Sequence, residues 1–80
     1  MPDLFGDEIL AKPSFTEMLV EAQREVGFRR RNYPMWVSRG TMKEPAAKLH
    51  LHRMEAIAKF LEWAIPREAE IRAIAEKEKG

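Results

Sequence analysis

A cluster of basic and aromatic side chains lies in the stretch from Phe28 to Gly40, Phe-Arg-Arg-Arg-Asn-Tyr-Pro-Met-Trp-Val-Ser-Arg-Gly. Arginine and lysine bind phosphate groups, and aromatic rings stack on nucleic-acid bases. This chemistry predicts a surface that contacts nucleic acid. The predicted contact residues are Arg29, Arg30, Arg31, Tyr33, Trp36, Arg39 and Lys43.

A structural role for the same residues is the alternative. Tyr33 and Trp36 are three residues apart, so on a helix they share a face and can fill a core with their polar tips reaching solvent. The arginines would then pair with Glu21, Glu25 or the C-terminal acids. Both interpretations are open at this point.

Other groups that could do chemistry do not form a catalytic pattern. His50 and His52 are two residues apart on an expected helix, so they point to nearly opposite sides and cannot hold one metal ion. The hydroxyls of Ser14, Ser38 and Thr41 are better placed as caps or turn residues than as nucleophiles. The chain has no cysteine and no glycine-rich phosphate loop. We therefore predict no catalytic residue, no metal and no cofactor, and a protein that is not an enzyme.

Charge is distributed unevenly along the 80 residues, although the net charge is only +1. Residues 24–53 carry eight bases and two acids, whereas residues 1–23 carry five acids and one base. The middle third is therefore where a polyanion would bind. No apolar run reaches the roughly 20 residues of a membrane span, and the first residues are acidic where a secretory signal is basic. We expect a cytoplasmic protein that does not contact a membrane.

Residues 1–13 are expected to form an N-terminal arm, because proline and glycine interrupt them and no helical period is present. The arm carries four large apolar residues, which is too many for a plain linker. They are expected to dock either on the protein's own helices or on another protein. These residues are Leu4, Phe5, Ile9 and Leu10.

The first helix is expected to begin after Ser14, because Ser14-Phe15-Thr16-Glu17 has the capping-box pattern. Pro34 must kink or end this helix, or else start a short second helix that reaches Ser38. Gly40 is a natural C-terminal stop. Apolar residues at helical spacing are Phe15, Met18, Leu19, Ala22 and Val26.

A second capping-box pattern over Thr41–Glu44 predicts the start of the next helix, with Pro45 in its first turn. The apolar stripe of this helix is wide, which indicates packing against two neighbours. Pro66 either ends it or begins a shorter third helix. The predicted fold is all-α, with residues 14–80 forming a single small domain: a helical hairpin of two long helices, the first kinked or broken at Pro34, plus a shorter C-terminal helix.

The order Arg-Arg-Arg-x-Tyr-Pro-x-x-Val-x-x-Gly across residues 29–40, followed by a capped helix with Met-Glu-Ala-Ile at residues 54–57, resembles a family of small phage and prophage proteins of unassigned function. The resemblance covers residues 29–57. It implies an origin in a mobile element and a two-helix hairpin. It supplies no activity.

Two shorter resemblances point to replication. Asp3-Leu4-Phe5 resembles the Leu-Phe core of peptides that bind the bacterial sliding clamp, which implies Leu4 and Phe5 as partner-binding residues. The order Thr16-Glu17-Met18, a basic aromatic bend and then a helix is similar to the small theta subunit of the bacterial replicative polymerase.

Together these observations predict a phage-type accessory protein that binds DNA, RNA or a host nucleoprotein complex through its basic and aromatic surface. The alternative is a protein-binding inhibitor or adaptor that acts on a host enzyme such as a clamp, a polymerase or an anti-phage defence complex. A homodimer is compatible with either function, because a small hairpin leaves an apolar stripe to pair.

Overall fold

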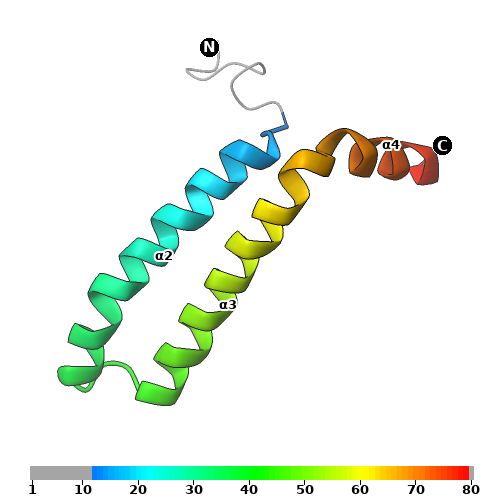
Figure 1. Ribbon diagram of the computed structural model, residues 1–80. Helices are drawn as coiled ribbons and strands as arrows, with labels where there is room; N and C mark the ends of the chain where they lie inside the picture. Colours follow the sequence, from blue (N-terminus) through cyan, green and yellow to red (C-terminus); the bar gives the residue numbers. More distant parts are fainter. Residues whose placement is uncertain (1–11, 80) are drawn as a thin grey trace, which may run out of the picture.

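The computed structural model describes residues 12–79, and all the elements in this range are helical. Helix α2 spans Phe15–Ser38, α3 spans Glu44–Ala64, a short 3-10 turn η1 spans Ile65–Arg67, and α4 spans Glu68–Lys79. Figure 1 shows α2 and α3 side by side, with α4 turned away from them. The prediction of an all-helical fold is confirmed for the described residues.

Ser14 caps the start of α2 as its sequence predicts. The Glu17 backbone N–H donates to Ser14 Oγ over 3.1 Å, and the Ser14 N–H donates to Glu17 Oε1 over 2.8 Å. This reciprocal pair satisfies two amides that have no partner inside the helix. The Ser14 N–H, aided by the Ser14 side chain, also holds the pKa of the Glu17 carboxyl below its usual value, because both contacts favour the ionised form.

Helix α2 is continuous through Pro34. The prediction that the helix breaks at Pro34, or that a separate short helix starts there, is therefore wrong. Proline removes one backbone hydrogen bond to the Arg30 carbonyl. Tyr33 and Val37, on either side of Pro34 in the sequence, line one groove together with residues of α3. The missing bond therefore lies in a part of α2 that faces α3.

Gly40 ends α2 in a Schellman motif. Its φ of +78° is in the left-handed region that favours glycine. The Gly40 N–H donates to the Val37 carbonyl, and the Thr41 N–H donates to the Trp36 carbonyl, each over 3.0 Å. These two bonds have the pattern that satisfies the last carbonyls of a helix. The predicted stop at Gly40 is confirmed.

The capping box predicted over Thr41–Glu44 is wrong. The Thr41 hydroxyl donates to the Trp36 carbonyl over 3.1 Å, so it closes α2 instead of opening α3. Lys43 occupies the cap position of α3 and makes no side-chain capping bond, while Pro45 lies in the first turn. Proline there removes one of the amides that a cap would otherwise satisfy.

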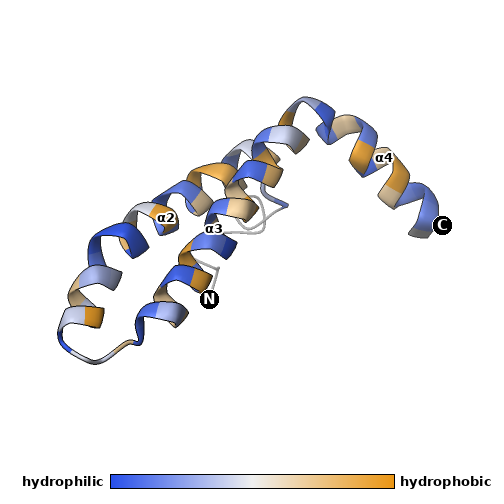
Figure 2. Ribbon diagram, turned by 60° about the horizontal axis from the view of Figure 1, so that its bottom comes forward, coloured by the Kyte–Doolittle hydropathy of each residue, from blue (hydrophilic) through white to orange (hydrophobic). Residues whose placement is uncertain are grey.

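The core between α2 and α3 is thin and built largely from alanine. Leu61 packs with Ala22 and Ala58, and four larger apolar residues surround them: Phe15, Met18, Leu19 and Met54. Small side chains let two helices approach closely, but they remove little apolar surface from water. In Figure 2, hydrophobic and hydrophilic residues alternate along both helices. The residues buried in the described part of the chain are Ala22, Val26, Ala47, Ala58, Leu61 and Ala64.

Helix α4 meets the rest of the protein mainly at its first turns. The Phe15 N–H donates to Glu68 Oε1 over 3.1 Å, and Arg72 Nη2 donates to the Pro13 carbonyl over 2.8 Å. The Arg72 guanidinium also lies 5.0 Å from the centre of the Phe15 ring. Arg72 Nε also donates to Glu68 Oε2 over 2.8 Å, and this bond, together with that from the Phe15 N–H, lowers the pKa of the Glu68 carboxyl. The start of α4 is thereby tied to the start of α2.

One face of α3 remains uncovered by the described residues. Ile57, Phe60 and Trp63 are 49%, 59% and 52% exposed. The wide apolar stripe of this helix predicts two neighbouring helices, but along this face residues 12–79 supply none. The reason is that α4 turns away at Pro66 instead of folding back along α3 (Figure 1).

Candidate nucleic-acid interface

The three consecutive arginines of α2 point in different directions, as the turn of about 100° per residue requires. Arg29 is turned toward α3. Its Nε donates to Glu25 Oε1 over 2.9 Å, and its Nη1 donates to the His50 carbonyl over 2.8 Å. The guanidinium also lies 5.9 Å from the centre of the Tyr33 ring. Arg29 therefore joins the two long helices, and its side chain is only 23% exposed, which limits the access of a phosphate to it.

Arg30 forms an ion pair with Glu55 of α3. Its side chain is 61% exposed, so solvent screens the pair and its contribution to stability is small. A phosphate would nevertheless have to compete with Glu55 for this guanidinium. Arg30 thus lies at the edge of the candidate interface.

Arg31 is the arginine of the three that faces solvent on the outside of α2. Its side chain lies over Gly27, where an added Cβ would meet Arg31 Nη1 at 3.3 Å. Arg39 and Lys43 are also exposed, at the turn between α2 and α3. Within residues 12–79, none of these three cations forms an ion pair, so they remain available to an anion.

The predicted aromatic residues Tyr33 and Trp36 are half-buried, and neither belongs to the buried core. Their ring centres are 5.6 Å apart. Phe28, which the sequence analysis did not single out, packs edge-on against Trp36 with ring centres 6.0 Å apart and is itself 41% exposed. Tyr33 faces the groove toward α3, whereas Phe28 and Trp36 form an aromatic ridge on α2 itself.

A stripe of alternating cationic and apolar residues runs along the outside of α2. Positions 24, 28, 31, 35 and 39 fall within about 80° of one another on a helix that turns about 100° per residue. The buried positions of α2, Ala22 and Val26, lie on the opposite side, toward α3. We call this set the α2 outer stripe: Arg24, Phe28, Arg31, Met35 and Arg39.

The α2 outer stripe is open to solvent and unopposed by acids over most of its length. Met35 is 40% exposed, similar to Phe28. Arg24 pairs with Glu21 at 3.4 Å, but both side chains are about 70% exposed, so the pair is weak. No acidic residue occurs from Val26 to Lys43. Phe28 and Met35 could have been identified from the sequence, because each lies three or four residues from an arginine of the stripe. The run of three consecutive arginines drew attention away from this spacing.

The remaining predicted residues give no second site within the described range. Leu4 and Phe5 lie outside residues 12–79, so their predicted role in partner binding stays a prediction. His50 and His52 are exposed, and the described residues contain no group of three potential metal ligands. None of the helices described is both long enough and apolar enough to cross a membrane.

Comparisons of the chain with protein-family models, with curated proteins and with solved structures find no match. The resemblance to small phage proteins and the two replication resemblances therefore stay predictions. The functional assignment has to come from the chemistry of the surface itself.

Proposed function

We propose that this chain is a non-enzymatic accessory protein of phage type that binds nucleic acid, or a nucleoprotein complex, through the basic and aromatic surface of α2. The observation that carries the proposal is the α2 outer stripe. Three exposed arginines alternate there with Phe28 and Met35, on a helix face that points away from α3.

The spacing of the stripe suits a polyanion. Arg24 and Arg39 are separated by about 22 Å along the helix axis, at about 1.5 Å per residue, with Arg31 between them. Each arginine offers several N–H donors to phosphate oxygens, and the apolar side chains between them can contact sugar or base. An exposed helix face about 10–12 Å across can also enter the major groove of a duplex.

The sequence-predicted residues take different roles in this proposal. Arg31, Arg39 and Lys43 supply phosphate contacts, joined by Arg24. Trp36 supplies a ring beside them. The other three predicted residues face α3: Arg29 and Arg30 bind groups of α3, and Tyr33 lines a groove with residues of that helix. They position the surface and do not contact the nucleic acid.

We propose further that the two long helices form a hairpin and that α2 is kinked at Pro34. Pro34 lies between Arg31 and Arg39, and a helix that lacks the hydrogen bond to the Arg30 carbonyl bends easily at that point. Such a bend would change the direction of the stripe partway along and let it follow a curved backbone.

The test is a salt titration of binding, measured by fluorescence anisotropy with labelled single-stranded DNA, duplex DNA and RNA. The four phosphate contacts from Arg24, Arg31, Arg39 and Lys43 predict that the logarithm of the duplex binding constant falls with the logarithm of salt concentration with a slope of about −3.6, or about −2.8 for a single strand. The Arg31→Glu, Arg39→Glu double variant should weaken binding at least about tenfold and flatten the slope by about 1.8 on duplex DNA.

The matched control is the double variant Lys59→Glu, Lys77→Glu, which changes the net charge equally but lies on α3 and α4. It should leave the affinity within about twofold, since only the average field of the protein changes. A slope near zero for the unaltered protein, or equal losses in both double variants, would refute the stripe as the binding surface. The first result would favour the alternative function, a protein-binding inhibitor or adaptor of a host enzyme.

A further inference from the structure

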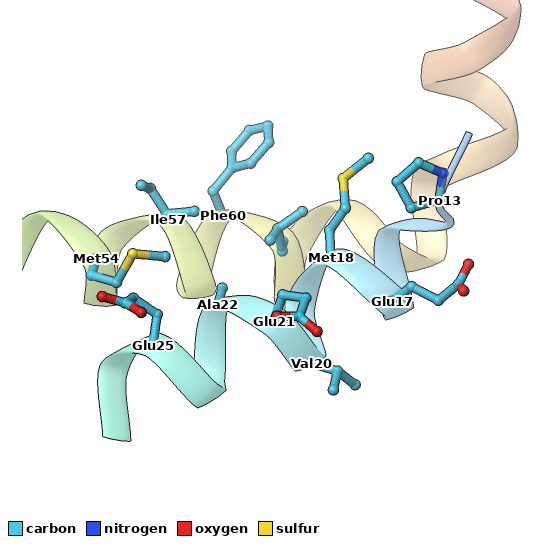
Figure 3. A pocket seen from close by; sticks show the side chains of 11 residues that line it. Pro13, Glu17, Met18, Val20, Glu21, Ala22, Glu25, Met54, Ile57 and Phe60 are labelled. Atoms are coloured by element: carbon cyan, nitrogen blue, oxygen red, sulfur yellow. The ribbon is translucent and has the colours of Figure 1, made fainter. Parts of the chain in front are cut away.

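An open apolar groove runs between the N-terminal half of α2 and the C-terminal half of α3 (Figure 3). Figure 3 shows Met18, Ile57 and Phe60 pointing to the same side of the two helices. This groove is separate from the α2 outer stripe. Its floor and wall are formed by Met18, Ala22, Met54, Ile57, Phe60 and Leu61.

The two edges of the groove differ in charge. Glu17, Glu21 and Glu25 follow one another at four-residue spacing along the α2 edge, where Glu21 also pairs with Arg24 and Glu25 with Arg29. The α3 edge is apolar at Ile57 and Phe60. Arg53 lies four residues before Ile57 on the same side of α3, outside the lining of the groove; it is exposed and forms no ion pair with a described residue.

We infer that this groove is the interface with a second copy of this chain, and that the two copies close a four-helix bundle. A two-fold axis parallel to the helices puts α2 of each copy opposite α3 of the other, because such an axis exchanges the two edges. Phe60 of one copy then packs over Met18 of the second copy, and Arg53 of one copy approaches the acidic edge of the second copy near Glu25.

The size of the face fits a dimer. The groove occupies about half the length of a larger face of the two long helices. The 21 residues of α3 make this whole face about 31 Å long, and two helices packed about 9 Å apart make it about 19 Å wide. The flat area of this face is therefore about 600 Å². The projecting side chains add to the accessible surface, which brings the face close to the roughly 800 Å² per partner that a stable interface buries. The thin alanine core also leaves a chain of this size short of buried apolar surface, which a second copy supplies.

Charge distinguishes the second copy from the other possible occupants. Residues 1–11 contain three acids and no base, so they would place like charges against Glu17, Glu21 and Glu25. A nucleic acid would be repelled by the same carboxylates. A second copy brings Arg53 and an apolar ridge to that edge, and its own acidic edge meets Arg53 of the first copy.

The experiment is sedimentation equilibrium of the full chain over a concentration range up to about 100 µM, with melting temperatures measured over the same range. The expected mass is twice that of the 9.3 kDa chain, and the melting temperature should rise with protein concentration. Phe60→Glu should raise the dissociation constant of the dimer by about 100-fold, as for a central interface residue. Arg53→Glu should raise it about tenfold, with a smaller salt dependence than the parent protein.

The matched control is Phe28→Glu, the same substitution at a similarly exposed phenylalanine on the outer face of α2. It should leave the dissociation constant unchanged within about twofold. Circular dichroism should show full helicity for all three variants, since each replaced side chain is exposed. A parent chain that sediments as a monomer at the highest concentration would overturn the inference, as would equal effects of Phe60→Glu and Phe28→Glu. A chain that dimerises only after residues 1–11 are deleted would overturn it as well, because the groove would then belong to that segment.

Discussion

Replacement of Leu61 by alanine tests whether the contact between α2 and α3 is the main source of stability. Leu61 is 8% exposed and is the largest side chain in the buried cluster with Ala22 and Ala58. The substitution removes three carbon atoms, which at about 0.8 kcal/mol per buried methylene amounts to about 2.4 kcal/mol of lost transfer free energy. The cavity left behind raises the range for buried leucines to about 2.7–5 kcal/mol.

The size of this loss matters because the chain has few other sources of stability. A core in a chain of about 80 residues rarely supplies more than about 3–5 kcal/mol, and this sequence has no cysteine to add a disulfide. Leu61→Ala is therefore expected to remove most of the protein's stability at 25 °C. Leu61 also lines the groove proposed as the dimer interface, so the parent protein and its variants are compared at one protein concentration.

Leu49→Ala is the matched control, since it makes the same substitution in the same helix at a position that is 45% exposed. About half of this side chain is already in water, so the expected cost is about 1 kcal/mol. Urea unfolding followed by circular dichroism measures both values, provided that the slopes with urea agree. Equal losses for the two variants would refute the view that Leu61 lies at the centre of the packed core.

Three further predictions concern local features. Gly27→Ala should stabilise the protein by about 0.5–1 kcal/mol, because the new Cβ would meet only the movable end of the Arg31 side chain. Gly40→Ala should instead destabilise the protein by about 1–2 kcal/mol, because φ is +78° at this position. The two melting temperatures must therefore shift in opposite directions. Ser14→Ala should cost about 1 kcal/mol through loss of the cap, lowering the melting temperature by about 4–8 °C, while Thr16→Ala in the same turn should have little effect. The pKa of Glu68 is lowered from 4.5, so the stabilising contacts of its carboxylate are complete above that pH and are lost as the pH falls through the lower pKa of the folded state. Glu68→Gln should therefore reduce stability at neutral pH and make little difference in strong acid. Unfolding measured across the pH range tests both expectations.

The candidate interface was only partly accessible from the sequence. The basic and aromatic composition pointed to the helix that carries the candidate interface, and the turn of about 100° per residue already required the three consecutive arginines to diverge. Which arginine turns toward α3 depends on where α3 lies. The carbonyl of His50 and the carboxylate of Glu55, more than 20 residues away in sequence, occupy Arg29 and Arg30 and leave Arg31 facing outward.

Local signals determined most of the helical architecture. The Ser14 cap and the Gly40 stop depend on contacts within six residues, so the sequence alone specifies them. The sequence did not determine the role of Thr41, because its hydroxyl lies close to both the end of α2 and the start of α3. The structure shows that it hydrogen-bonds to the Trp36 carbonyl and so closes α2. The open face at Ile57 and Phe60 was also beyond the sequence, since an apolar stripe shows that a helix needs neighbours but not which neighbours are present. Local capping signals thus decided where α2 begins and ends, and tertiary packing decided which charges and which apolar side chains remain free to bind.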